Sequence, residues 1–378
     1  MDKRATTARL RRLVAVVGAA LLIPLGVSST ASAAPADSGD GHRAITLGAP
    51  ETLRTVTKAD ATAAGDLDCR AGESVLTRTQ SCSYWRIPVE YTVNKVPEGT
   101  ATLWAKSTAT LDPRNRYTWH QTVTLRLTDP TTWAGFATNG SVGFDCGHCQ
   151  VPASGERYLF PGLTVTYQFT VTSPGRALVS DSIRPYATLS APRHDKGSAV
   201  IGSTFRPRCD NTPRITPQTT GGCVYPDVPA LYKIDVTNAR VAAVGWHVLW
   251  AQRNLKHPWG VVNSRYPLHR TFDQTLQGRN RDVACGTGVP RPPNRPDLTC
   301  DEYPFAQTYE GASRNPDYSC HFLNERANSR EGSVRKADLN GQRVLENDAF
   351  YVQVVNVPKA KRDLGELSPY GPVGCGHD

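Results

Sequence analysis

The sequence predicts two folded domains of different class, an N-terminal all-β sandwich followed by a C-terminal α+β domain. Three observations carry this prediction. Apolar and polar residues alternate in strand after strand between residues 65 and 224. From residue 225 onward, apolar residues recur at helical spacing instead. The chain of 378 residues is also long enough for two domains.

Residues 1–34 have the pattern of an export signal. A charged head precedes an uncharged apolar stretch from Leu13 to Val27, and Ala31-Ser32-Ala33 offers a cleavage site. The apolar stretch is short for a bilayer span, which argues against a membrane anchor. We therefore expect a secreted, extracellular protein with no membrane segment. Residues 35–64 are rich in Ala, Gly, Asp and Thr, and we expect them to form a flexible leader.

The charge of the chain is too weakly basic to identify a partner. The formal net charge is +9 at pH 7, but the first 34 residues hold five basic residues and only one acid. The remaining chain is closer to neutral. Such a balance is compatible with a nucleic-acid partner but does not by itself indicate one. A polyanion would have to bind through a local patch.

All ten cysteines follow the export signal, and an even number in an exported chain predicts five disulfides. The sequence does not fix their connectivity. A half zinc site or a redox motif is the alternative for Cys146-Gly-His-Cys149, but no second cysteine pair has matching zinc spacing. The simplest prediction pairs the cysteines in sequence order, as Cys69–Cys82, Cys146–Cys149, Cys209–Cys223, Cys285–Cys300 and Cys320–Cys375.

The strands of the N-terminal domain, residues 65–224, show strict alternation bounded by turn residues. Several such strands at this spacing are typical of an antiparallel sandwich. His120 and His194 are isolated and do not indicate catalysis, so the role of this domain stays open. The clearest predicted strands are residues 85–93, 117–127, 163–171 and 183–189.

The C-terminal domain, residues 225–378, is predicted to contain three helical segments and a final strand. Thr237-Asn238 is the expected cap of the first helix, and Asn328, with Glu331 at the capping-box position, the expected start of the third. A proline-rich loop separates Cys285 from Cys300, and a disulfide would close it. The predicted helical segments are residues 241–255, 268–281 and 328–340, and the strand is 349–357.

One stretch of this domain gathers three carboxylates, Asp301, Glu302 and Glu310. Adjacent carboxylates repel, so the first two are costly together unless a cation or a proton lies between them. Pro304 makes this stretch a shaped corner rather than a helix interior. Because acids are common in turns, the acids alone indicate either a solvated turn or a metal-assisted acid/base site.

The stretch Cys-Asp-Glu-Tyr-Pro-Phe-Ala at 300–306, with Thr-Tyr-Glu-Gly-Ala at 308–312, resembles the signature of the secreted NucA/NucB-type deoxyribonucleases. In bacillus members the segment reads Asp-Glu-Trp-Pro and then Glu-Gly-Gly. Here Tyr303 replaces the Trp and Ala312 replaces the second Gly. The resemblance continues to Ala327-Asn328-Ser329, Glu331-Gly332-Ser333 and Arg343-Val344-Leu345, and covers roughly the last 110–150 residues.

This resemblance implies a ββα-metal fold and a metal-dependent, non-specific endodeoxyribonuclease that acts on DNA as a monomer. It implies Asp301 as the general base, with Glu302 and Glu310 orienting the base or binding the waters of the metal. Asn328 is implied as a ligand of Mg²⁺ or Mn²⁺, and Asp338 is aligned less closely as a further metal residue. The candidates for phosphate contacts are Arg270, Arg281 and Arg330, with Arg326 and Arg335 beside them.

Three alternatives stay open. An Asp base is weak at neutral pH because its reference pKa is about 3.9, so His321 and His269 are alternative bases. A non-catalytic secreted binding or adhesion protein with a degenerate nuclease-like domain is a second function class. A glycoside hydrolase that pairs Asp301 with Glu310 is a third. The presence of both acids favours an enzyme over a degenerate domain.

The first prediction concerns the thiols. Because the ten cysteines are expected to form five disulfides, alkylation of the exported protein without prior reduction should add no mass. Mass spectrometry of the intact chain measures this directly. A chain in which Cys146 and Cys149 are reduced and bound to zinc would contradict the prediction.

Overall fold

Long strands with alternating burial form the N-terminal part of the chain. The structure, a computed structural model, describes residues 41–50, 54–57, 67–174, 178–215, 221–358 and 373–374. In β4 (Gln80–Val93), Ile87, Val89 and Tyr91 are buried while Arg86 and Pro88 between them are exposed. Successive side chains of a strand point to opposite faces, so this alternation turns one face of β4 into the core.

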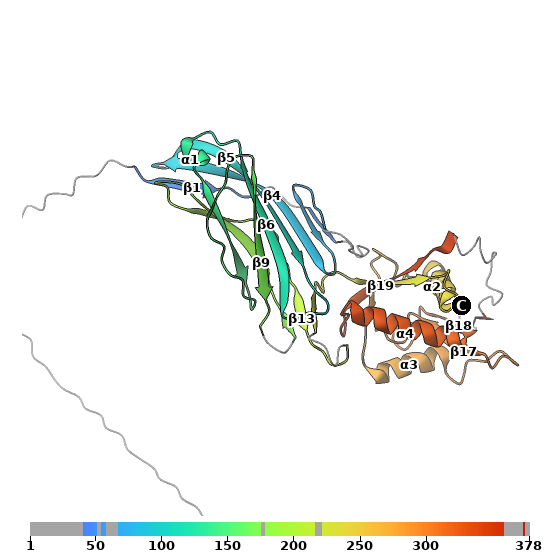
Figure 1. Ribbon diagram of the computed structural model, residues 1–378. Helices are drawn as coiled ribbons and strands as arrows, with labels where there is room; N and C mark the ends of the chain where they lie inside the picture. The colour runs from blue at the N-terminus through green and yellow to red at the C-terminus, as the bar shows by residue number, and fades with distance from the viewer. Residues whose placement is uncertain are drawn as a thin grey trace, which may run out of the picture. The chain divides into compact units, whose positions relative to one another are not determined.

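These strands form two larger sheets and one small one (Figure 1). The seven-stranded sheet has the order β2-β3-β4-β5-β6-β9, with β1 also paired to β4. Its other strands are β1 (Arg43–Leu47), β2 (Arg54–Thr57), β3 (Glu73–Leu76), β5 (Val96–Thr110), β6 (Thr118–Thr128) and β9 (Thr164–Thr172). The four-stranded sheet consists of β12 (Gly197–Val200), β11 (Ile183–Ser190), β7 (Asn139–Cys146) and β8 (Arg157–Tyr158). The small sheet consists of β10 (Val179–Ser180), β13 (Arg208–Asp210) and β14 (Gly222–Val224), and α1 (Trp133–Phe136) is a single turn.

One hydrophobic core is shared by the seven-stranded and the four-stranded sheets. Leu103 and Leu125 of the larger sheet belong to the same cluster as Val142 and Leu189 of the smaller one. Burial of this apolar surface is the main force that holds the two sheets together. The four strands expected most clearly from the sequence correspond to β4, β6, β9 and β11, and they are confirmed.

Part of the expected leader, residues 35–64, belongs to the larger sheet. β1 pairs antiparallel with β4, and Ile45 in it is buried in the shared core. A five-residue strand with one buried apolar residue gives little sequence signal, which is why this strand was not expected. β2, also within the expected leader, pairs parallel with β3. Residues 1–34, the expected export signal, and leader residues 35–40, 51–53 and 58–64 lie outside the described residues. No helix in the described part of the chain is both long and apolar enough to span a bilayer.

The C-terminal part combines two three-stranded sheets with three helices. In the first sheet, β19 (Ala349–Val355) lies between β15 (Ala230–Asp235), to which it is parallel, and β16 (Leu268–His269). In the second sheet, β18 (Ser319–Asn324) lies between β17 (Leu298–Tyr303) and β20 (Val373–Gly374). The helices are α2 (Ala242–Asn254), α3 (Gln274–Cys285) and α4 (Glu325–Gly341). The whole chain is thus β-rich, with its longer helices in the C-terminal part.

The strand pair and helix β17-β18-α4 position the candidate site. β17 and β18 are antiparallel, and Asp301 lies opposite His321 in their register. α4 follows β18 directly, and the side chain of Asn324 caps it by accepting a hydrogen bond from the backbone N–H of Ala327. The stretch expected as a corner is therefore a strand up to Tyr303, and the corner itself begins at the cis peptide bond to Pro304.

Two helix starts differ from the sequence predictions. α4 begins one turn earlier than Asn328 because Asn324 already supplies the cap, so Glu331 is an interior residue rather than part of a capping box. The segment expected as a helix over 268–281 begins with the short strand β16, and α3 starts only after Asp273. The carboxylate of Asp273 accepts hydrogen bonds from the backbone N–H groups of Thr275 and Leu276, as the side chain of an N-cap residue does. α2 has nearly its expected extent, and its N-cap residue is Val241, which makes no side-chain cap. Oδ1 of Asn238, expected as part of the cap, instead accepts the backbone N–H of Arg240 in the turn before the helix.

Four of the five expected disulfides are confirmed: Cys69–Cys82, Cys146–Cys149, Cys209–Cys223 and Cys285–Cys300. The second of these joins the two cysteines of the Cys146-Gly-His-Cys149 run, which lie close to the carboxylate of Asp181. The last one closes the proline-rich loop immediately before Asp301, as expected. The fifth pair involves Cys375, which lies outside the described residues.

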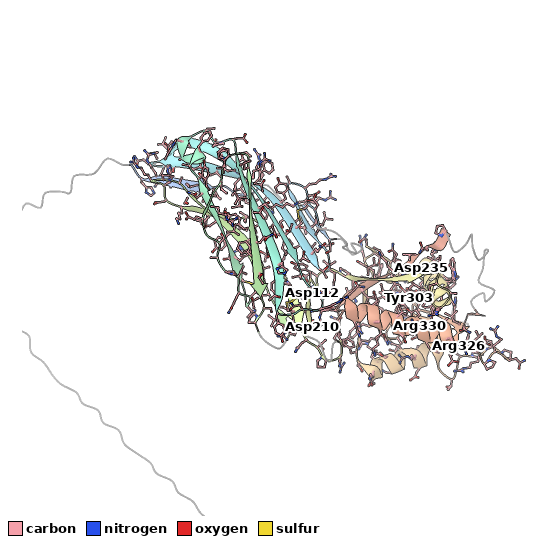
Figure 2. All side chains as sticks on the ribbon, in the orientation of Figure 1. Asp112, Asp210, Asp235, Tyr303, Arg326 and Arg330 are labelled. Atoms are coloured by element: carbon pink, nitrogen blue, oxygen red, sulfur yellow. A yellow bond between two sulfur atoms is a disulfide. The ribbon has the colours of Figure 1, made fainter. Side chains whose placement is uncertain are left out.

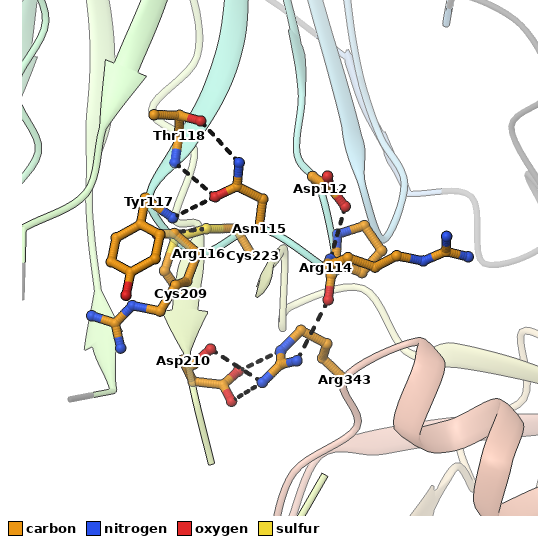
Figure 3. The surroundings of a disulfide bond; sticks show 11 residues. Asp112, Arg114, Asn115, Arg116, Tyr117, Thr118, Cys209, Asp210, Cys223 and Arg343 are labelled. Carbon is orange, nitrogen blue, oxygen red and sulfur yellow. Dashed lines mark hydrogen bonds and ion pairs between the residues drawn. A yellow bond between two sulfur atoms is a disulfide. The ribbon is translucent and has the colours of Figure 1, made fainter. Parts of the chain in front are cut away.

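A network of buried charges connects the β-rich part to the loop that follows α4. The guanidinium of Arg343 binds the carboxylate of Asp210, directly after the disulfide-bonded Cys209 (Figure 3). Arg78 and Arg208 both bind the carboxylate of Asp348, at 2.8 Å and 2.6 Å. These side chains are almost fully buried. A buried ion whose partner is removed is strongly destabilising, so this network fixes residues 343–348 in place.

The second prediction concerns this network. Asp348→Asn removes the carboxylate charge that the buried Arg78 and Arg208 both bind, and we expect a loss of about 3–5 kcal/mol in the free energy of unfolding. Denaturant unfolding followed by circular dichroism measures it. The matched control is Asp145→Asn, which breaks the exposed pair with Arg184 and should cost at most about 1 kcal/mol. Equal losses in the two variants would show that the buried network does not carry the stability assigned to it.

Candidate active site

The two adjacent acids of β17 point to opposite faces of the strand. Asp301 is 5% exposed and lies on the same side as Tyr303, whose ring belongs to the core formed with α2 and α4. Glu302 points to the other side, where its Oε2 is 3.7 Å from the sulfur of Cys285 at the end of α3. Its Oε1 accepts a hydrogen bond from the backbone N–H of Ala306. Because residues i and i+1 of a strand diverge, the two carboxylates that are neighbours in sequence do not share one site.

Asp301 contacts a histidine that the sequence analysis did not consider. Nδ1 of His247, on α2, lies 2.6 Å from Oδ2 of Asp301. Nε2 of the same ring lies 3.0 Å from Oγ of Ser319 on β18. The ring also stacks on His321, with ring centroids 4.2 Å apart. His247, Ser319 and His321 are all buried, so Asp301 lies in a polar cluster closed off by α2.

One face of α4 is turned toward the same cluster. Asn328, Glu331 and Arg335 follow one another at spacings of three and four residues, which places them on one side of the helix. Nδ2 of Asn328 donates to the carbonyl oxygen of Cys300 at 3.0 Å, next to Asp301 in β17. Cζ of the Arg335 guanidinium lies 3.5 Å from the centroid of the Phe305 ring. Nη1 of the same group lies 3.5 Å from Oε2 of Glu331. Nδ2 of Asn328 also lies 3.2 Å from Oγ1 of Thr299, whose side chain is on the same face of β17 as that of Asp301. Asp301 and Asn328 therefore lie on the same side of the strand pair.

Burial changes the acid strength of these carboxyl groups. It raises the pKa of Asp301 to about 7, although the positive charge of Arg335 acts in the opposite direction. Burial and the neighbouring charge of Asp301 also raise the pKa of Glu302, and burial raises the pKa of Glu331. A base is most effective when its pKa lies near the working pH. Burial therefore acts against the main objection to an Asp base, its low reference pKa.

Glu310 forms a separate pair with His269. Its Oε1 lies 2.7 Å from Nδ1 of His269, and its Oε2 accepts the backbone N–H of the same residue at 2.8 Å. The hydrogen bond from the imidazole to Glu310 raises the pKa of His269, against the effect of burial. Since Asp301 and Glu310 bind different histidines, nothing in the described contacts pairs them as a glycoside hydrolase would require.

The predicted phosphate contacts divide into one buried and two exposed arginines. Arg270 is 3% exposed, and its guanidinium donates to the carbonyl oxygen of Val344 and to Oδ1 of Asn340. Its guanidinium is thus engaged with these partners, and its expected role as a phosphate contact stays a prediction. Arg281 on α3 is exposed, and so are Arg330 and its neighbour Arg326 on α4 (Figure 2).

The two predicted metal residues, Asn328 and Asp338, do not lie together. They are ten residues apart on the single helix α4, which corresponds to about 15 Å along its axis. The carboxylate of Asp338 accepts a hydrogen bond from Gln342 at 2.7 Å near the far end of the helix. At this separation the two side chains cannot ligate the same ion, so the expectation that Asn328 and Asp338 form one metal site is wrong.

The oxygen donors that suit a hard cation on this face are Asn328 and Glu331. Both hydrogen bonds of Asn328 among the described residues are made by its nitrogen Nδ2, which leaves Oδ1 available. Oε1 of Glu331 is buried and has no hydrogen-bond partner within the described part of the chain. An amide oxygen and a carboxylate oxygen are ligands that Mg²⁺ and Mn²⁺ accept.

His247, Ser319 and Glu331 were missed as site residues by the sequence analysis. Only His247 carried a usable signal: it stands between Val244 and Ala251 on the apolar face of the predicted helix, where a polar side chain needs a partner. Ser319 gave none, and Glu331 was interpreted as a helix cap.

The comparison with protein families supports the expected resemblance. The family model for deoxyribonuclease NucA/NucB matches residues 262–353, in the C-terminal part of the chain and over less than a third of its length. The match includes Asp301, Glu302, Glu310 and Asn328, and it begins after α2 has ended. No curated protein matches this chain.

The third prediction concerns the pH dependence of stability. Because Glu310 raises the pKa of His269, the folded chain holds this proton more tightly than the unfolded chain, whose His titrates near pH 6.5. The stabilisation is fully present below that pH and is lost as pH rises through the folded pKa. Glu310→Gln should therefore lower Tm more at about pH 5 than at about pH 8.5. A Tm difference that is the same at both pH values, measured by differential scanning fluorimetry, would contradict this.

Proposed function

We propose that this protein is a secreted, metal-dependent, non-specific endodeoxyribonuclease in which Asp301 is the general base. The observation that carries the proposal is the arrangement of the strand pair and the helix. Asp301 of β17 and Asn328 of α4 lie on the same side of β17, in a segment that matches a deoxyribonuclease family. We further propose that β17, β18 and α4 form a ββα-metal unit.

The chemistry assigned to the chain is proton transfer from water. A water molecule attacks the phosphorus in line with the leaving oxygen, and Asp301 takes its proton as the new P–O bond forms. The bond between phosphorus and the leaving sugar oxygen breaks, and that oxygen leaves with a proton from solvent. With a pKa near 7, Asp301 is both largely ionised at slightly alkaline pH and basic enough to accept a proton.

A divalent cation, Mg²⁺ or Mn²⁺, would neutralise charge on the phosphate and assist the leaving oxygen when bound. Oδ1 of Asn328 and the carboxylate of Glu331 would hold it, because these are the oxygen donors on the Asp301 side of α4. Asp338 lies too far along the helix to take part. Glu302 lies on the other face of β17 and would not contact the cation. The hydrogen bond that it accepts from the backbone N–H of Ala306 would instead help to hold the end of β17 in place.

DNA is the proposed substrate, bound through phosphates by exposed cations. Arg281 and Arg330 are exposed, and the absence of a large net charge makes a local contact of this kind the expected one. We propose that the protein acts as an extracellular monomer. We also propose that the two sheets sharing one core form a β-sandwich domain, which begins with β1 at Arg43 rather than at the expected residue 65 and ends at residue 224. It is distinct from a nuclease domain over 225–378, and we assign the sandwich no activity.

One observation favours the alternative, a non-catalytic secreted binding protein. Asp301 is only 5% exposed, and α2 covers its face of β17. A base that never meets water or phosphate cannot cleave DNA. The enzyme proposal therefore requires that DNA or its attacking water reach Asp301 past α2, and an assay of cleavage separates the two functions.

The fourth prediction is that the wild-type protein cleaves plasmid DNA in the presence of Mg²⁺ or Mn²⁺. Cleavage should stop when EDTA is added, because EDTA removes the cation. Asp301→Asn keeps the shape of the side chain but cannot accept the proton, so the cleavage rate should fall about 10²–10⁴-fold with DNA binding retained. The matched control is Asp297→Asn, which alters an exposed acid near the start of the same strand and should cleave normally.

Agarose-gel assays of nicking and linearisation measure these rates. A wild-type protein without cleavage at any metal concentration would leave the binding-protein alternative standing. Full activity of Asp301→Asn would mean that the base lies elsewhere, with His321 and His269 as the next candidates.

A further inference from the structure

α2 brings a histidine from outside the family match onto the carboxylate that the proposed mechanism uses. The match starts at residue 262, whereas α2 ends at Asn254. His247 lies on the buried face of α2 with Val244 and Val248, and it is 2% exposed. α2 packs against β17, β18 and α4, the elements that position the candidate site. The residues that match the family therefore do not make up the whole surroundings of Asp301.

The imidazole of His247 is held on three sides. Nδ1 lies 2.6 Å from Oδ2 of Asp301, and Nε2 lies 3.0 Å from Oγ of Ser319. His321 stacks on its ring, and Trp250, one turn further along α2, lies against His321 with ring centroids 5.1 Å apart. These contacts leave the ring a single orientation, with both nitrogens engaged.

The two partners of the ring together determine its tautomer, because an ionised carboxylate only accepts whereas the hydroxyl of Ser319 can donate or accept. When this hydroxyl donates to Nε2, the ring proton resides on Nδ1, and Nδ1–H donates to Oδ2 of Asp301. A hydrogen bond to a carboxylate favours its ionised form, which is the form a general base needs. Ser319 itself is fully buried, so the chain Ser319–His247–Asp301 does not present a nucleophile as a hydrolase triad would.

A histidine that only fills the core is the simpler explanation, and one observation argues against it. The bond to His247 is the one side-chain hydrogen bond that Asp301 makes within the described part of the chain. A buried carboxylate needs hydrogen-bond donors, and without one it would take up a proton or rotate. An apolar residue at this position would serve packing equally well but would leave Asp301 with neither orientation nor ionisation fixed.

We propose that His247 is a positioning residue for Asp301: its Nδ1–H holds the oxygen Oδ2 and leaves Oδ1 to accept the proton of the attacking water. This inference rests on the proposed function and deepens it. It assigns α2, which precedes the family match, a part in the reaction. His247 neither touches DNA nor exchanges a proton with it, so its effect falls on turnover rather than on substrate binding.

The experiment compares two substitutions at this position in the full exported chain. His247→Asn places an amide N–H close to the position of Nδ1, whereas His247→Leu fills the space without a donor. His247→Leu should lower kcat on duplex DNA by about 10–100-fold, the size of effect seen for residues that orient a reacting group. KM should stay unchanged, and His247→Asn should recover most of the lost kcat. A residue needed only for packing would give neither the kcat-specific loss nor the recovery by Asn.

The matched control is His257→Leu, which removes another histidine–carboxylate bond, from Nδ1 to Asp317 at 2.8 Å, just after the end of α2. It should leave kcat and KM unchanged. Circular dichroism and the melting temperature establish that each variant is folded before its kinetics are compared.

Ser319→Ala is the second test variant and is used where His247→Leu does not fold. It removes a single buried oxygen and is therefore the smaller change. Without the hydroxyl, either tautomer of His247 is accessible, and kcat should fall by less than in His247→Leu while KM holds. A folded His247→Leu or, where that variant is unfolded, a folded Ser319→Ala with wild-type kcat would overturn the inference. If the wild type cleaves no DNA, the proposed function itself fails. If it does cleave, and only Asp301→Asn is inactive, the proposed function stands and the role of His247 is wrong.

Discussion

The alternation of side chains along β17 is the constraint on which the candidate site depends. It sends Asp301 into the cluster beneath α2 and α4, and it sends Glu302 toward α3 and the disulfide between Cys285 and Cys300. Each carboxylate therefore meets its own surroundings, although the two are neighbours in sequence. In the sequence, the repulsion between adjacent carboxylates indicates a cation or a proton between them, and this divergence reduces that repulsion. A cation between the two acids is not needed to explain them.

Because Asp301 points to the face of β17 opposite to Glu302, its own surroundings determine its pKa. Asp301 is removed from water, which raises its pKa, but it keeps one strong donor in His247 and one nearby cation in Arg335. Burial raises the pKa of Asp301, and the positive charge of Arg335 lowers it. The two effects together hold its pKa near neutrality, which is the range in which a general base works best. The helix that covers Asp301 is thus also the source of the group that we infer to orient it.

The fold was predictable to the extent that it follows local periodicity. Strict alternation in β4, β6, β9 and β11, and helical spacing in α2, gave the right elements, because burial of one face imposes those periods. Caps were less predictable, since Asn324 and Asn328 both precede a plausible helix and only the end of β18 decides between them. The disulfide between Cys285 and Cys300 agrees with the simplest pairing, in sequence order, although the sequence did not fix the connectivity.

The candidate site was predictable only where a motif carried it. Asp301 and Asn328 came from the resemblance to one family, and the structure brings both to one side of β17. His247 and Ser319 come from distant segments, so their meeting at Asp301 depends on tertiary packing that no local pattern encodes. Arg270 was expected from its residue type and Asp338 from a loose alignment. Neither reveals that Arg270 is buried and that Asp338 stands at the far end of α4.

The most direct test of this account is the position of a bound metal ion. Anomalous diffraction from crystals of the protein grown with Mn²⁺ locates the ion without any assumption about activity. The account predicts one ion beside Asn328 and Glu331, on the side of β17 that carries Asp301. An ion on the opposite side, beside Glu302 and α3, or one held by Glu310 and His269 with none at Asn328, would contradict it.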